Sequence, residues 1–289
     1  MNRRLKTPVW AACWMAALSV WFLTIAAPNP AWAYVLEGPH ILELTAKAMG
    51  PIAALKVEQK LLIYPQDPKK VPTVYDETAI YVMPERFRSD ISSERIQRTH
   101  LVFADSAITL IDGRTALGPD PFDLYQRLLR SRSRTRLMQV LNRLGVETAI
   151  SSLGRLDDTV VFVIGAHYPD ETASQLAVDK ETFLPLRLVL VDRHAEAPNR
   201  RLEIYYREWH KIQSGWFPLQ VTFYQDDRLV REIRVADLHL NPSIPAEMMD
   251  PEALKASVAA HAADTPQTQN QQAVETVQKA VQDFQKKFE

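Results

Sequence analysis

A long succession of segments in which apolar and polar residues alternate constrains this chain most. Alternation with a period of two is typical of strands with one buried face. The short gaps between segments carry turn signals such as Asp112-Gly113 and Asp226-Asp227, which indicate antiparallel hairpins. The pattern predicts strands at Ala54–Ile63, Val74–Met83, Arg86–Ser92, Gln97–Ala104, Ala107–Asp112, Thr148–Leu153, Thr159–Tyr168, Gln175–Asp179, Leu184–Asp192, Arg201–Glu208, Trp216–Gln225 and Leu229–Leu240.

Helical patterns occur before, between and after these strands. Pro39–Met49 has apolar residues on one helical face and ends at Gly50. Residues 122–144 follow Pro121 and read as two helical pieces that end at Gly145. Strands never alternate regularly with helices, so a doubly wound nucleotide-binding fold is not expected. The order of elements predicts an α+β domain over residues 34–250, built on an antiparallel sheet.

The first 33 residues have the features of a secretory signal peptide. Arg3, Arg4 and Lys6 precede an almost wholly apolar run, and Ala31-Trp-Ala33 offers a cleavage site. An uncleaved membrane anchor is the alternative, because the apolar run is about long enough to span a bilayer. We expect cleavage after Ala33 and a periplasmic mature protein.

The mature chain must be stable without disulfides. Its precursor has one cysteine, Cys13, which lies within the signal peptide. The precursor has 34 basic and 35 acidic residues, and losing the three signal-peptide cations leaves a net charge of −4. This charge gives no reason to expect nucleic acid as a partner.

No pattern points to catalysis, a metal or a cofactor. Only 8 glycines are present, and the sole P-loop-like spacing, from Gly113 to Gly118, is followed by Pro119 and Asp120 instead of Lys and Ser or Thr. The seven histidines are widely separated, and no Gly-x-Ser-x-Gly occurs. We therefore expect neither an enzyme nor a metal site.

Several strands are apolar on both faces, and a second apolar face must meet helices, another sheet or a ligand. Helices covering an inner sheet face would explain this pattern. The sharper hypothesis is a curved sheet whose concave side binds apolar ligands beneath a lid formed by residues 122–144. The cavity residues predicted from alternation are Leu61, Ile63, Phe87, Phe103, Leu110, Val161, Val163, Leu186 and Leu188. The apolar residues predicted for the lid are Phe122, Tyr125, Leu128, Leu129, Met138 and Leu141.

Five arginines gather within ten residues of this lid. They could form a solvated helix face, or they could attract anionic headgroups or an acidic partner. These residues are Arg127, Arg130, Arg132, Arg134 and Arg136.

The C-terminal region reads as a helix at 251–263, a polar linker at 264–272 and an amphipathic helix at 273–289. Apolar residues in the last segment recur at spacings of three and four, which gives one stripe. The stripe could contact the body, a membrane or another helix, and its nearly neutral polar face favours a protein partner or self-association. It consists of Val274, Val277, Val281, Phe284 and Phe288.

Over residues 40–250, the order of elements resembles the periplasmic lipoprotein-carrier superfamily, which includes LolA-like, LolB-like and lipoprotein-sorting proteins. The local matches are Tyr81-Val-Met-Pro-Glu-Arg-Phe87, Phe103–Leu110, Asp120-Pro-Phe122, Leu176–Leu186 and Asn241-Pro-Ser-Ile-Pro245.

The resemblance implies an incomplete, strongly curved β-barrel whose hydrophobic cavity takes acyl chains beneath a helical lid. It implies a carrier of acylated ligands, most often lipoproteins moved toward the outer membrane. A lipid-sensing module that binds a protein partner is the alternative. The carriers use an inward-facing arginine just before the proline of the first motif to hold the lid. Here that position is Met83, and Arg86 and Arg88 are the candidate substitutes.

Overall fold

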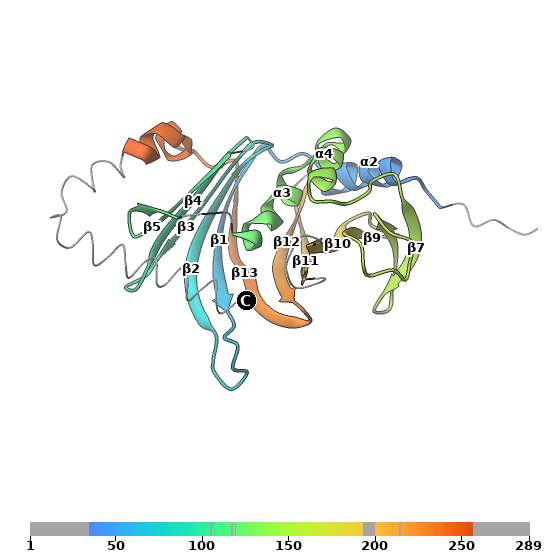
Figure 1. Ribbon diagram of the computed structural model, residues 1–289. Helices are drawn as coiled ribbons and strands as arrows, with labels where there is room; N and C mark the ends of the chain where they lie inside the picture. The colour runs from blue at the N-terminus through green and yellow to red at the C-terminus, as the bar shows by residue number, and fades with distance from the viewer. Residues whose placement is uncertain are drawn as a thin grey trace, which may run out of the picture. The chain divides into compact units, whose positions relative to one another are not determined.

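The computed structural model describes residues 35–104, 106–116, 118, 120–192, 200–213 and 215–256. Their dominant feature is one antiparallel sheet that curves around a short helix, α3 (Figure 1). Its strands are β1 (Ala54–Ile63), β2 (Thr73–Val82), β3 (Arg86–Ser92), β4 (Gln97–Phe103), β5 (Ser106–Ile111), β6 (Arg114–Thr115), β7 (Ser151–Leu156), β8 (Thr159–Ile164), β9 (Gln175–Asp179), β10 (Pro185–Asp192), β11 (Arg200–Ile212), β12 (Gly215–Gln225) and β13 (Arg228–Leu240).

The sheet order is β6-β5-β4-β3-β2-β1-β13-β12-β11-β10-β9-β8-β7. Hairpins therefore build each half, and the pairing of β1 with β13 joins the halves. In that pairing Leu55 lies opposite Leu240, and Leu61 lies opposite Ile233. The predicted α+β class with an open, curved antiparallel sheet is confirmed.

The helices of the described residues are α2 (Gly38–Met49), η1 (Pro121–Leu124), α3 (Tyr125–Arg130), α4 (Arg134–Arg143) and η2 (Ala246–Met249). Residues 251–256 are also helical. Helix α4 begins after Ser133, whose hydroxyl accepts a hydrogen bond from the backbone N–H of Arg136. Helix α2 ends at Gly50, which has a φ of 70° and so suits glycine. No described helix is long and apolar enough to cross a membrane.

The two faces of the sheet have different coverings. Residues directly opposite each other on paired strands project to the same face. Tyr81 lies opposite Phe87, and the Phe87 ring is 6.3 Å from the Tyr125 ring of α3. We call the face that contacts η1 and α3 the inner face, and the opposite one the outer face.

The C-terminal segment covers part of the outer face. Met249 of η2 and Leu254 pack against Ile80, Leu101 and Leu110, which come from β2, β4 and β5. The guanidinium of Arg88 also donates to the backbone oxygen of Met248 at 2.7 Å. Figure 1 shows this segment beside β3 to β5.

Two further sequence expectations fall on residues that the structure does not describe. These are the signal peptide at 1–33 and the amphipathic helix at 273–289. The linker at 264–272 lies there too, and only residues 251–256 of the predicted helix at 251–263 are described.

Candidate functional site

The segment η1–α3 lies against the inner face through aromatic rings. The Phe122 and Tyr125 rings approach the Phe223 ring, with centroids 5.9 and 5.7 Å away. The Tyr206 hydroxyl donates a hydrogen bond to the Tyr125 carbonyl oxygen at 3.2 Å. All four aromatic side chains are buried, so the helical segment forms part of the core in this state.

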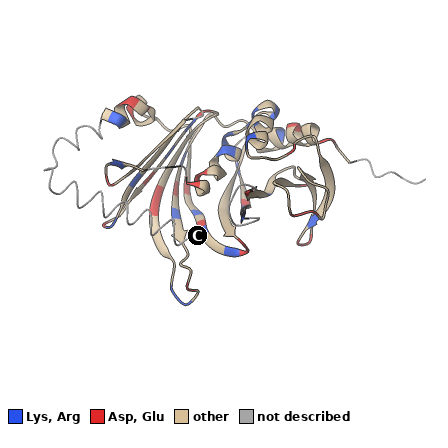
Figure 2. Cartoon of the chain, viewed as in Figure 1, with Lys and Arg blue, Asp and Glu red and all other residues tan. Residues whose placement is uncertain are grey.

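Beside these rings, Asp120, which caps η1, and Asp123 within η1 meet basic residues of the sheet. Asp123 accepts a hydrogen bond from Arg98 at 2.5 Å, and its carboxylate lies 3.5 Å from His100 Nδ1. Asp120 forms an ion pair with Arg231 at 3.4 Å. We call these five residues the ion-pair cluster. Figure 2 shows acidic colouring on the helical segment inside the curve of the sheet.

Local structure places both sides of the cluster. Arg98 and His100 are two residues apart on β4, so both project to the inner face. Asp120 and Asp123 are three residues apart at the start of a 3₁₀ turn, where such a spacing aligns side chains. Asp120 also caps the turn by accepting a hydrogen bond from Phe122 N at 2.9 Å.

Burial perturbs the titration of the cluster. Burial raises the pKa of Asp123 to about 6, although the neighbouring Arg98 opposes this effect. Burial, and then the charge of Arg98, lower the pKa of His100 to about 3. At neutral pH, Asp123 is therefore ionised and His100 is neutral. The Thr109 hydroxyl lies 2.8 Å from His100 Nδ1 and satisfies that nitrogen.

Two guanidinium N–H groups of the cluster have no hydrogen-bond acceptor among the described residues. They are Arg98 Nη1 and Arg231 Nε, and both are buried. Buried donors are normally satisfied, so the cluster retains capacity to bind a further polar group. A second polar group lies nearby on the inner face, where Glu77 accepts hydrogen bonds from Gln59 at 2.7 Å and from Ser89.

The nine predicted cavity residues are divided between the two faces by strand pairing. Leu61, Ile63, Phe87 and Leu188 lie on the inner face. Phe103, Leu110, Val161, Val163 and Leu186 lie on the outer face.

The prediction depended on the phase of the alternation in each strand, and an error of one residue moves the whole set of side chains to the other face. Strand β8 is apolar on both faces, so alternation alone gave no preference for Val161 and Val163. On β10, an irregularity between Pro185 and Arg187 places Leu186 against the outer cluster of Val161 and Val163. Ligand contact by the four inner-face residues stays a prediction.

The structure buries most of the predicted lid residues. Phe122, Tyr125, Leu128, Leu129 and Leu141 are buried, and Met138 is half-buried. These residues come from η1, α3 and α4, so the predicted lid covers three short helices with a break at 131–133.

The five lid arginines have different surroundings. Arg130 is buried and donates to the Gln126 side chain at 2.6 Å and to the Pro84 carbonyl at 3.1 Å. Arg132 donates to three backbone carbonyls, Arg134 pairs with Glu43, and Arg127 and Arg136 are half-buried. Arg130 and Arg132 therefore hold helices on the body, which the sequence interpretation did not anticipate.

Neither candidate substitute for the carriers' lid arginine faces the lid. Arg86 lies over the Phe103 ring at 4.9 Å, and Arg88 binds Asp90 and the Met248 carbonyl, all on the outer face. The arginines that contact η1 are Arg98 and Arg231. The sequence interpretation missed both, together with His100, Asp120 and Asp123 as a cluster. The sequence does contain a signal for this cluster. Arg98 and His100 are alternate residues of one strand, so two polar side chains lie on a single face, and polar side chains on a buried face need partners.

Among the described residues, no group of three or more His, Cys, Asp or Glu side chains is placed to hold a metal ion.

No protein-family model and no curated protein matches this sequence. Solved structures do match. A LolA superfamily protein from Nitrosomonas europaea aligns with a TM-score of 0.51 and 11% identity, over 75% of this chain and 99% of that one. The chain has a LolA-like fold. An outer membrane lipoprotein-sorting protein domain from Vibrio parahaemolyticus aligns with a TM-score of 0.50 and 10% identity, over 75% of this chain and 98% of that one.

A third structure, a DUF1329 family protein from Desulfovibrio piger, aligns with a TM-score of 0.50 and 13% identity. It covers 75% of this chain and 97% of its own chain. The resemblance drawn from the sequence is thus confirmed at the level of the fold. At these identities the LolA-like fold is what the comparisons establish.

Proposed function

We propose that this protein is a periplasmic carrier or binder of acylated ligands, which it holds on the inner face beneath η1–α3. One observation supports the proposal most strongly. The segment η1–α3 covers aromatic and aliphatic side chains of the inner face, and a separate set of polar contacts holds it on the sheet. These contacts are the ion-pair cluster and the bonds of Arg130 and Tyr206 to backbone oxygens. Lipoproteins are the ligand class that the LolA-like fold favours.

The energetics of an acyl chain support a covered site. Burial stabilises a chain by about 0.8 kcal/mol per methylene, so a lipid with about thirty methylenes would lose about 24 kcal/mol if its chains faced water. Crossing an aqueous compartment therefore requires an apolar surface that can be covered. The Phe87 and Phe223 rings of the sheet, both of which contact the Tyr125 ring of α3, provide such a surface.

Ligand entry requires η1–α3 to move, because its aromatic rings occupy the inner face. The ion-pair cluster would act as the reversible attachment. Its charges are paired when η1 lies on β4 and β13. Separating them costs free energy, which the burial of an acyl chain must offset. A ligand whose polar head accepts from Arg98 Nη1 and Arg231 Nε would lower that cost.

A fluorescent fatty acid tests this proposal. We expect the probe to bind the purified protein and to be displaced by a diacylated lipopeptide. Ile63→Trp fills the inner face beside Arg231 and should weaken binding of the probe. Phe103→Trp is the matched control, because Phe103 is partly exposed on the outer face. Absence of probe binding by folded protein, or equal effects of the two variants, would refute the proposal.

The periplasmic location is tested separately. We expect the exported protein to begin at Tyr34, which N-terminal sequencing of the protein from a periplasmic fraction would show. A mature protein that retains residues 1–33 in a membrane fraction would favour the anchored alternative.

A further inference from the structure

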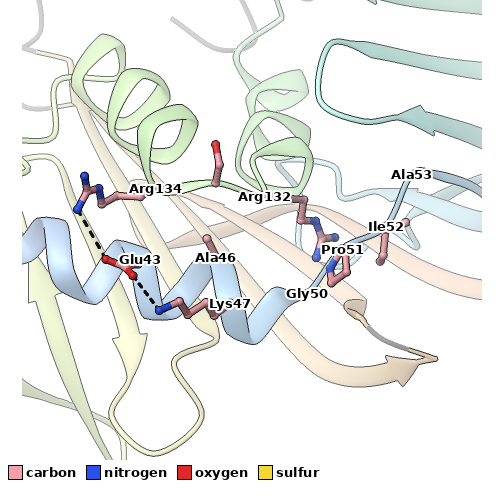
Figure 3. A pocket seen from close by; sticks show the side chains of 10 residues that line it. Glu43, Ala46, Lys47, Gly50, Pro51, Ile52, Ala53, Arg132 and Arg134 are labelled. Atoms are coloured by element: carbon pink, nitrogen blue, oxygen red, sulfur yellow. Dashed lines mark hydrogen bonds and ion pairs between the residues drawn. The ribbon is translucent and has the colours of Figure 1, made fainter.

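A pocket of about 650 Å³ lies where the C-terminal end of α2 meets the connection between α3 and α4 (Figure 3). Its charged lining residues are Glu43, Lys47, Arg132 and Arg134. Three cations therefore face one carboxylate. The pocket is distinct from the inner-face surface beneath η1.

Arg132 is fixed within this lining. Its Nη1 donates to the carbonyl oxygens of Met49 at 2.7 Å and Trp216 at 3.1 Å, and its Nε donates to Leu129 at 3.0 Å. Its Nη2 is buried and has no acceptor among the described residues. Burial lowers the pKa of Arg132 to about 10, so the guanidinium stays charged at neutral pH.

Lys47 and Arg134 form the outer part of the pocket, and their side chains are largely exposed. Both contact Glu43, which lies 2.8 Å from Lys47 Nζ and 3.6 Å from Arg134 Nη1 (Figure 3). Glu43 thus already supplies one anionic group to these two cations. The N-terminal end of α4, which begins at Arg134, adds a partial positive charge.

Apart from Ser133, the rest of the lining carries no polar side chain. Ala46, Pro51, Ile52 and Ala53 contribute side chains beside the cations. A small inorganic anion would use the charged part alone, whereas a phosphate attached to an apolar group would use both parts.

We propose that this pocket binds a phosphate group, carried by an amphiphilic ligand whose apolar part contacts Ala46, Pro51 and Ile52. This inference rests on the proposed function in one respect, which is that a lipid headgroup is taken as the source of the phosphate. Arg132 donates hydrogen bonds to backbone oxygens of α3, α2 and β12, and so links these three elements. A phosphate in the pocket would therefore bind the residue that links them.

Isothermal titration calorimetry at low ionic strength tests the pocket with two probes, short-chain dihexanoyl phosphatidate and inorganic phosphate. The double variant Lys47→Gln/Arg134→Gln removes two exposed cations, and we expect about tenfold weaker binding of both probes. Glu43→Gln removes the competing carboxylate and should strengthen binding about threefold. Lys69→Gln, which removes an exposed cation of the β1–β2 connection, is the matched control and should change nothing.

Tighter binding of phosphatidate than of phosphate supports a lipid headgroup, and equal binding overturns the amphiphilic ligand and leaves a site for free phosphate. Absence of binding by both probes overturns the inference, and so does a double variant that binds like the original protein. The fluorescent fatty acid provides the independent readout. If the fatty acid binds and neither phosphate probe does, only the phosphate pocket is refuted. If the phosphate probes bind and the fatty acid does not, only the proposal of an acyl carrier is refuted.

Discussion

Asp123 and Arg98 are both buried, and their charges face each other across the boundary between η1 and β4. Arg98→Met would leave the Asp123 carboxylate buried without the cation that donates a hydrogen bond to it. We expect a loss of about 3–5 kcal/mol in the free energy of unfolding, measured by urea denaturation. Because the double variant Arg98→Met/Asp123→Leu leaves no unpaired charge, it should recover part of this loss.

The control is Lys60→Met, which breaks the exposed pair of Lys60 with Asp76 and should cost less than about 1 kcal/mol. Equal losses for Arg98→Met and Lys60→Met would show that the cluster contributes no more than a surface pair.

His100 gives the cluster a specific dependence on pH. Burial lowers its pKa from 6.5 to about 3, so the unfolded state binds more protons between these values. This group therefore reduces stability as the pH falls from about 6.5, by up to about 1.4 kcal/mol per pH unit. Asp123, whose pKa is raised to about 6, has the opposite effect between about pH 4 and 6, since its folded form binds the extra proton.

The variant His100→Gln separates the two contributions. Relative to the original protein, it should become progressively more stable as the pH is lowered from 6.5 to 4. Urea denaturation of both proteins at several pH values measures the difference. Parallel stability curves would mean that His100 is not held neutral by burial.

At the scale of elements, η1–α3 is the part of the inner face that must move. We expect its amides to exchange hydrogen faster than those of β1 and β13, and to exchange faster still when a bound fatty acid displaces the segment from the inner face. Mass-spectrometric hydrogen exchange with and without the ligand measures this. Strong and equal protection in both states would make the segment a fixed part of the core.

The C-terminal segment is a second element whose role can be measured. Met249 is 2% exposed and packs on Ile80, Leu101 and Leu110 of the outer face. Met249→Ala should destabilise the protein by about 2–5 kcal/mol in thermal or urea denaturation, because it leaves a cavity. Glu252→Ala, at a largely exposed side chain in the same segment, should cost little. Similar values for both variants would show that the segment does not contribute to the core.

For the whole molecule, the predicted linker and amphipathic helix at 264–289 lead to a prediction about association. We expect deletion of residues 265–289 to leave the unfolding midpoint and fatty-acid binding unchanged, and to abolish self-association or capture of a protein partner. Sedimentation and pull-down measure the association. A deletion that unfolds the domain would place the tail within the core.

Local patterns in the sequence were enough to predict most of the helices and strands and the class of fold. Strands such as Ala54–Ile63, and the helical break after Pro121, follow from local periodicity and from turn residues, which act over a few neighbours. The helix at Pro39 and its end at Gly50 were also predictable from local signals. The buried aromatic residues of the lid followed from helical spacing.

The face that each strand turns inward, and the charges that meet, became known from the folded structure alone. A shift of one residue reverses a strand that is apolar on both sides, as Val161 and Val163 show. The pairing of Arg98 with Asp123 joins residues 25 positions apart, and that of Arg231 with Asp120 joins residues 111 positions apart. No local pattern encodes such pairs, because each charge becomes tolerable in the core only after folding has placed its partner beside it.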